Sequence, residues 1–126
     1  MRADLTKEAR PGSGETRETP PGLGDVLDDL YKVIADREQT QPDGSYTTYL
    51  FNSGLDKILK KIAEEAGEVI IASKNDSSER IAEETADLLY HLLVLLCDRG
   101  IPLTQVRDEL TKRRAEKTQS GPAPLG

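Results

Sequence analysis

Apolar residues recur every three or four positions along most of the chain, with polar residues between them. This spacing is typical of amphipathic helices. It predicts four helices, over residues 24–39, 55–74, 78–99 and 103–115. In the third of these, the apolar residues from Leu88 to Cys97 cover nearly every direction around the helix axis, so we expect burial on all sides. The pattern therefore predicts an all-α fold.

The helical pattern is interrupted twice. Pro42, Asp43 and Gly44 are typical of a turn, and residues 45–51 have a strand-like composition of tyrosine and threonine. Because no second strand is predicted, we expect residues 45–51 to form a loop that packs over the helices or lines a pocket. Residues 75–78 form a short polar turn, so the helices before and after it should be antiparallel neighbours.

Both ends of the chain have little apolar surface to bury. Residues 1–22 are rich in proline, glycine, threonine and charge, and residues 116–126 include the run Ser-Gly-Pro-Ala-Pro. Such segments are typical of disordered tails. Residues 23–115 are then predicted to form one domain, as expected for a chain of 126 residues.

Composition narrows the class of protein. Charged residues make up 32% of the chain and aromatic residues 4%, which favours a bundle of aliphatic helices over a β-sandwich. The net charge of −6 argues against binding to nucleic acid or to an anionic membrane. The single cysteine, Cys97, cannot form an internal disulfide, and the first ten residues have no apolar segment of the signal-peptide type. We therefore expect a cytoplasmic protein.

Two clusters of carboxylates lie in the helices on either side of the polar turn. An EExxE motif occupies residues 64–68, and an ExxD motif occupies residues 84–87. Residues three or four apart share a helix face, so the acids of one helix can meet those of the next. Acidic groups that converge beside an apolar core are unfavourable unless a cation joins them. Oxygen ligands without cysteine or histidine favour Mg²⁺, or Mn²⁺, over Zn²⁺. Either motif alone would be ordinary solvated helix surface, but the pair predicts a metal site.

Other reactive side chains have simpler interpretations. His91 follows Asp87 by one helical turn and is close enough to reach its carboxylate, but a hydrogen-bonded core histidine is favoured over a catalytic base. Cys97 is expected to be a small core residue. Four lysines bracket the acidic helix and are candidates for binding phosphate, although most surface lysines only aid solubility: Lys57, Lys60, Lys61 and Lys74.

Together these motifs resemble a known family. The EExxE and ExxD motifs on consecutive helices are the signature of the all-α, MazG-like nucleoside triphosphate pyrophosphatases. Five segments are more specifically similar to the phosphoribosyl-ATP pyrophosphatase family: residues 42–47, 54–61, 64–69, 72–75 and 84–94. The resemblance covers residues 24–114.

The resemblance implies a nucleotide-binding hydrolase of histidine biosynthesis. Such an enzyme uses Mg²⁺ to hydrolyse the α–β phosphoanhydride of phosphoribosyl-ATP, releasing phosphoribosyl-AMP and pyrophosphate. The implied metal ligands are Glu65, Glu68, Glu84 and Asp87, with Glu64 in a supporting role. Glu64 or Glu68 would accept the proton of the attacking water. The implied contacts to substrate or phosphate are Tyr46, Thr47, Lys57, Lys60, Lys61, Lys74 and Asn75.

The apolar residues of the third predicted helix need more burial than one chain provides. We therefore expect two helical hairpins to pair into a four-helix-bundle-type homodimer, or a dimer of dimers. Two other functions stay open at this point. One is a house-cleaning pyrophosphatase of the same superfamily that acts on other nucleoside triphosphates. The other is a non-catalytic helical interaction module whose acidic surface is only solvated.

Overall fold

The computed structural model describes residues 19–75 and 77–120, and within them every regular element is a helix. The helices are α2 (Leu23–Thr40), α3 (Tyr46–Ser53), α4 (Leu55–Asn75), α5 (Ser78–Asp98) and α6 (Leu103–Ser120). The predicted all-α class is therefore confirmed. None of these helices is both long and apolar enough to cross a membrane.

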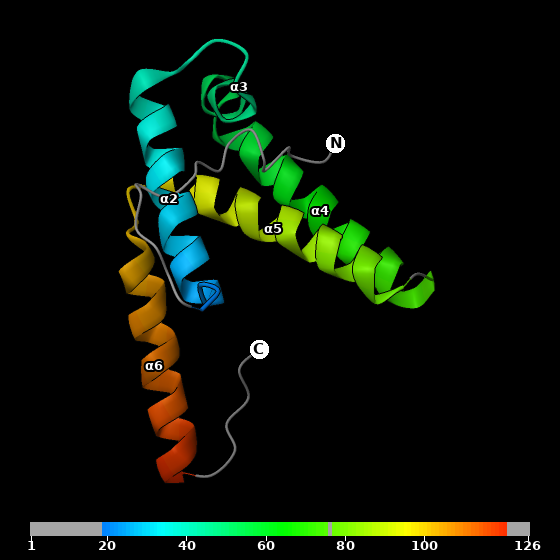
Figure 1. Ribbon diagram of the computed structural model, residues 1–126, viewed down its shortest axis with the longest axis vertical. Coiled ribbons are helices and arrows are strands. Elements are labelled where there is room, and N and C mark those ends of the chain that lie inside the picture. Colours follow the sequence, from blue (N-terminus) through cyan, green and yellow to red (C-terminus); the bar gives the residue numbers. More distant parts are fainter. Residues whose placement is uncertain (1–18, 76, 121–126) are drawn as a thin grey trace.

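The centre of the fold is the antiparallel hairpin of α4 and α5. These two helices pack against each other more extensively than any other described pair, and they run side by side in Figure 1. Helix α4 ends at Asn75, and the hydroxyl of Ser77 accepts a hydrogen bond from the backbone N–H of Arg80 at 3.4 Å. This N-cap starts α5 directly after the turn. The predicted hairpin is confirmed.

The core joins four helices. Its buried members come from α2, α3, α4 and α5: Ile34, Leu50, Ile58, Tyr90, Leu93, Val94 and Cys97. Cys97 is therefore the small core residue that the sequence predicts. By contrast, several leucines in the run 88–97 are only half-buried within one chain, including Leu88, Leu89 and Leu92. The described residues of one chain do not supply the full burial expected for that run.

Residues 45–51 differ from the predicted loop, because residues 46–51 belong to helix α3 and Ser45 is its N-cap. Ser45 caps this helix, its hydroxyl accepting a hydrogen bond from the backbone N–H of Thr48 at 3.3 Å. Thr47, Thr48 and Leu50 are buried against the neighbouring helices. Tertiary burial of this face and the N-cap outweigh the weak helix propensity of threonine and tyrosine.

Helix α6 is longer than predicted and projects from the rest of the chain. It continues to Ser120, beyond the predicted end near residue 115. It has only slight contact with the other described helices, and Figure 1 shows it extending away from the hairpin. Most of its side chains are exposed. The disorder predicted for residues 1–22 and 116–126 falls largely on residues 1–18 and 121–126, which lie outside the described residues.

Candidate metal centre

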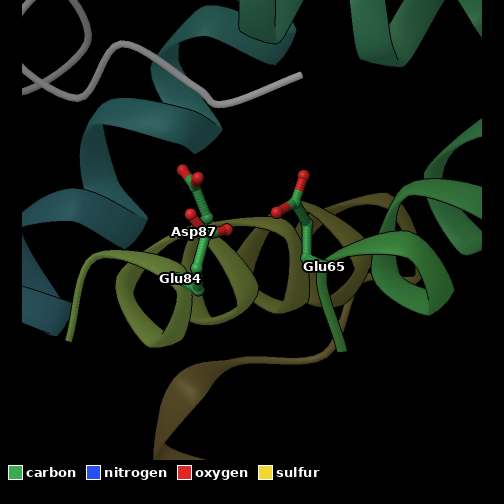
Figure 2. Close-up of side chains that lie close together, drawn as sticks. All are labelled: Glu65, Glu84 and Asp87. Atoms are coloured by element: carbon green, nitrogen blue, oxygen red, sulfur yellow. The ribbon is translucent and has the colours of Figure 1, made fainter. Parts of the chain in front are cut away.

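The hairpin brings three of the predicted carboxylates together. Glu65 of α4 and Glu84 and Asp87 of α5 each offer one carboxylate oxygen, and these oxygens all lie within 4.8 Å of one another (Figure 2). The three residues are 2%, 4% and 2% exposed, respectively. The three-residue spacing of the ExxD motif places Glu84 and Asp87 on the same face of α5, where that helix meets α4.

Two basic side chains pair with this carboxylate cluster. The Lys61 ammonium, one turn before Glu65, lies 3.5 Å from the Glu65 Oε1 atom. The Arg80 Nε atom, one turn before Glu84, lies 3.4 Å from the Glu84 Oε1 atom. Buried charges require such partners, because isolated carboxylates in an apolar setting are strongly unfavourable. The i,i+4 spacing of Arg80 and Glu84 was visible in the sequence, but the prediction overlooked this pair.

The donor set of the cluster suits a hard divalent cation. Carboxylate oxygens are the ligands that Mg²⁺ and Mn²⁺ prefer, and neither cysteine nor histidine is among the three residues. Three carboxylates at this separation can contact one ion, or two neighbouring ions. The residues present therefore fit the predicted metal.

Glu64 and Glu68 lie outside the cluster of three. Both are exposed on α4. The Glu64 Oε1 atom is 3.3 Å from the Lys61 ammonium, and the hydrogen bond from Lys61 lowers the pKa of Glu64. A carboxylate with a lowered pKa is a weaker base.

A pocket lined by lysines adjoins the acidic helix. Its volume is about 340 Å³, and its lining residues come from the start of α3 and the first half of α4: Tyr46, Tyr49, Lys57, Lys60, Lys61 and Glu64. Three of the four predicted lysines thus share one pocket. Lys61 contributes both to this pocket and to the carboxylate cluster, so the two sites are contiguous.

Other predicted contact residues lie elsewhere. Lys74 and Asn75 are exposed at the C-terminal end of α4, where the Asn75 side-chain amide donates to the Ile71 carbonyl oxygen at 3.1 Å. Thr47 is fully buried, and its hydroxyl is hydrogen-bonded to the Tyr90 hydroxyl. None of these three residues lines the lysine pocket.

His91 connects the start of α3 with the turn of α5 that carries Asp87. Its Nδ1 atom lies 2.7 Å from the backbone carbonyl oxygen of Asp87, and its Nε2 atom lies 2.9 Å from the Tyr46 hydroxyl. Burial lowers the pKa of His91. Burial also raises the pKa of Tyr46 to about 12, and the nearby carboxylates Glu65 and Asp87 act in the same direction. The interpretation of His91 as a hydrogen-bonded core histidine is confirmed, although its partner is the Asp87 backbone and not the carboxylate.

The chain is similar to proteins of one family. The profile of the family described as phosphoribosyl-ATP pyrophosphohydrolase matches residues 27–114. A phosphoribosyl-ATP pyrophosphatase of Pelotomaculum thermopropionicum is 57% identical over 97 residues, covering 77% of this chain and 99% of the relative. A phosphoribosyl-ATP pyrophosphatase of Listeria monocytogenes is 56% identical over 91 residues, covering 72% of this chain and 87% of the relative.

Some relatives are longer proteins that are named as bifunctional. The histidine biosynthesis bifunctional protein HisIE of Bacillus subtilis is 52% identical over 102 residues, covering 81% of this chain but 49% of the relative. The chain thus spans about half the length of that bifunctional relative.

Proposed function

Because the chain belongs to the phosphoribosyl-ATP pyrophosphohydrolase family, we propose that it hydrolyses phosphoribosyl-ATP with a divalent cation held by the carboxylate cluster. The products are phosphoribosyl-AMP and pyrophosphate, and the reaction is the second step of histidine biosynthesis. The names of the relatives at 56–57% identity support the hydrolase activity and the substrate. The proposed cation is Mg²⁺, with Mn²⁺ as an alternative.

The observation that carries the proposed metal role is the convergence of Glu65, Glu84 and Asp87. These residues would hold the cation at the α4–α5 contact, as their mutual distances and burial allow. A bound Mg²⁺ supplies positive charge that neutralises phosphate oxygens and lowers the pKa of a bound water. The chain itself contributes no nucleophile in this proposal.

The lysine pocket is the proposed site for the polyphosphate. Lys57 and Lys60 line it together with Lys61, which also faces the carboxylate cluster. Ammonium groups bind phosphate oxygens through charge-assisted hydrogen bonds. In this position the lysines would hold the leaving pyrophosphate beside the cation. Their local positive charge would offset the net negative charge of the chain.

Glu68 is the better candidate for the proton acceptor in this scheme. It lies one turn after the buried Glu65 on α4 and is exposed to solvent. Glu64 is bound to Lys61, which lowers its pKa and reduces its basicity. A general base also needs to reach the attacking water, which an exposed side chain at the edge of the cluster can do.

We also propose a homodimer, or a dimer of dimers, formed through the α4–α5 hairpin. Ile70 and Ile71 of α4 are 65% and 62% exposed, and leucines of α5 stay half-buried. Exposed apolar surface of this kind is typical of protein interfaces. The proposed location is the cytoplasm, without a nucleic-acid or membrane partner.

The test is pyrophosphate release in the presence of Mg²⁺. Phosphoribosyl-ATP is compared with ATP and with a panel of deoxynucleoside triphosphates at equal concentration. The proposal predicts fast, Mg²⁺-dependent release from phosphoribosyl-ATP alone. Faster release from the deoxynucleotides would instead indicate a house-cleaning pyrophosphatase. No release from any substrate would contradict the hydrolase assignment and favour the interaction module.

A further inference from the structure

The lysine pocket contains two kinds of side chain. One part of its lining consists of lysine ammonium groups, and another part consists of two aromatic rings, Tyr46 and Tyr49 of α3. The ring centroids of these tyrosines lie 5.9 Å apart, and the ring planes are inclined by 31°. The pocket therefore places positive charge and flat aromatic surface next to each other.

The fold holds the two rings to different degrees. The Tyr46 ring packs against the core and contacts the buried rings of Tyr90 and His91, at centroid distances of 6.2 and 5.8 Å. Tyr49 is 48% exposed and, within the part of the chain that the structure describes, does not belong to the core. Tyr49 can therefore offer its ring to a bound molecule without disturbing the packing of the helices.

Lys57 connects the two parts of the pocket. Its ammonium lies 6.0 Å from the centre of the Tyr49 ring, at the outer limit of a cation–π contact. The lysine stem is flexible, so the ammonium can turn from the ring to a phosphate and leave the ring face to another group. In a nucleoside triphosphate only the ribose separates the base from the α-phosphate. One nucleotide can therefore contact both Lys57 and Tyr49.

We propose that the Tyr49 ring is the stacking surface for the purine base of the substrate, while the lysines of the pocket hold the polyphosphate of the same molecule. The inference rests on the proposed function and names the residue that binds the base. Every nucleobase has a π-face, and a tyrosine ring binds it by offset stacking. Tyr49 thus contributes to substrate binding and takes no part in the chemical step.

The test uses two ligands that both carry a triphosphate, of which only one carries a base. The first is inorganic tripolyphosphate. The second is α,β-methylene-ATP, in which a methylene group replaces the bridging oxygen of the bond that the proposed reaction breaks. Each ligand is titrated calorimetrically into the full chain with Mg²⁺. If the wild type binds neither ligand, the polyphosphate site of the proposed function is contradicted, and that failure is distinct from a failure of the stacking role.

Tyr49→Leu removes the ring from the pocket. Leucine is a better helix former than tyrosine, so α3 should stay intact, as circular dichroism can verify. We expect the Kd for α,β-methylene-ATP to rise about tenfold and the Kd for tripolyphosphate to stay within about twofold of the wild type. An unchanged Kd for the nucleotide would overturn the proposal. An equal loss for both ligands would also overturn it, because Tyr49 would then support the phosphate-binding lysines and not the base.

Two further variants complete the comparison. Tyr49→Phe retains the ring without the hydroxyl and should bind both ligands as the wild type does. A loss as large as that of Tyr49→Leu would assign the contact to the hydroxyl and overturn the stacking role. Lys57→Met removes an ammonium and should weaken both ligands by a similar factor. A loss confined to the nucleotide in Lys57→Met would contradict the proposed division of the pocket.

Turnover of phosphoribosyl-ATP provides an independent measurement. For Tyr49→Leu we expect KM to rise about tenfold with kcat within about twofold of the wild type, because a contact to the base is present equally in the ground state and the transition state. Tyr49→Phe should retain both constants. A fall confined to kcat in Tyr49→Leu would place Tyr49 in the chemical step and contradict the proposal. An inactive wild type would contradict the proposed function, and the binding measurements would still decide the role of Tyr49.

Discussion

Glu65 and Asp87 belong to different helices, yet each offers a carboxylate oxygen within 4.8 Å of the other. Both residues are 2% exposed. Two buried like charges at this separation repel each other, and the repulsion is not screened by water. Replacing one of them with a neutral amide is therefore expected to relieve this repulsion and to remove one ligand of the proposed cation.

Asp87→Asn is expected to lower Mg²⁺-dependent pyrophosphate release by roughly a hundredfold or more, because a ligand of the proposed cation is lost. The helical circular dichroism spectrum should stay that of the wild type. The thermal midpoint of the metal-free protein should be unchanged or higher, since repulsion within the cluster is relieved.

Asp98→Asn is the control for that variant. It makes the same chemical change on the same helix, at a residue outside the cluster, and should retain full turnover. An unfolded Asp87→Asn protein would contradict the metal role and indicate that Asp87 is needed for the fold.

Removal of the metal should lower the thermal stability. A cation at about 100 times its Kd stabilises the native state by roughly 2.7 kcal/mol, which corresponds to about 10 °C or more in Tm for a domain of this size. The measurement is a thermal melt with Mg²⁺, with Mn²⁺ and with EDTA. Equal midpoints in all three conditions would indicate that the cluster binds neither metal.

Glu65 and Glu68 of the EExxE motif should differ in their effect on metal binding. Glu65 is buried in the cluster, whereas Glu68 is exposed, three residues further along α4. Glu65→Gln is therefore expected to weaken Mn²⁺ binding at least about tenfold, and Glu68→Gln to weaken it less while reducing kcat. Isothermal titration of each variant with Mn²⁺, paired with turnover, measures both effects. Equal losses of affinity would place Glu68 among the ligands.

Lys61 should matter for stability when the metal is absent. Its ammonium pairs with the buried carboxylate of Glu65, so Lys61→Met leaves that charge without its main counter-charge. We expect a loss of roughly 2–4 kcal/mol in the free energy of unfolding, measured by urea denaturation in EDTA. Lys60→Met, at the neighbouring exposed position, should lose less than about 0.5 kcal/mol. Saturating Mg²⁺ should reduce the deficit of Lys61→Met, because the cation replaces the missing positive charge.

The Cys97 thiol should be inert in the native protein. Burial raises the pKa of Cys97 from 9.0 to about 11, so the thiol stays protonated at pH 8. We expect slow labelling by iodoacetamide at pH 8 and fast labelling in urea. The raised pKa also predicts a stabilising contribution that is complete below pH 9 and is lost as the pH rises toward 11. Rapid labelling of the folded protein would contradict this burial.

The sequence was sufficient for four of the five described helices and for the carboxylate cluster. Regular apolar spacing specified α2, α4, α5 and α6, and matched acidic spacing on both sides of a short turn specified the cluster. It was not sufficient for α3, where the helix depends on the burial of Thr47 and Leu50 against other helices. Local composition carries no information about such tertiary contacts.

The dependence on tertiary packing also explains why the sequence could not show that Glu68 is exposed while Glu65 is buried. Spacing along α4 places Glu65 and Glu68 within one broad face of the helix. Which of them is buried depends on how α5 crosses that face, and this angle comes from the packing of the core. The hydrogen bond of Tyr46 to His91 likewise joins residues 45 positions apart, and no local pattern indicates it.

The slight packing of α6 against the other described helices affects how the protein unfolds locally. Helices unfold together only when they share buried contacts. Helices α2, α3, α4 and α5 all contribute to one core. Helix α6 is tied to that core mainly at its beginning, by Leu103 and by the bond from Tyr31 to Ile101. We therefore expect α6 to open as a subglobal unit of its own in the single chain, with amide hydrogens that exchange through fraying from Ser120 toward Leu103 while the core stays closed.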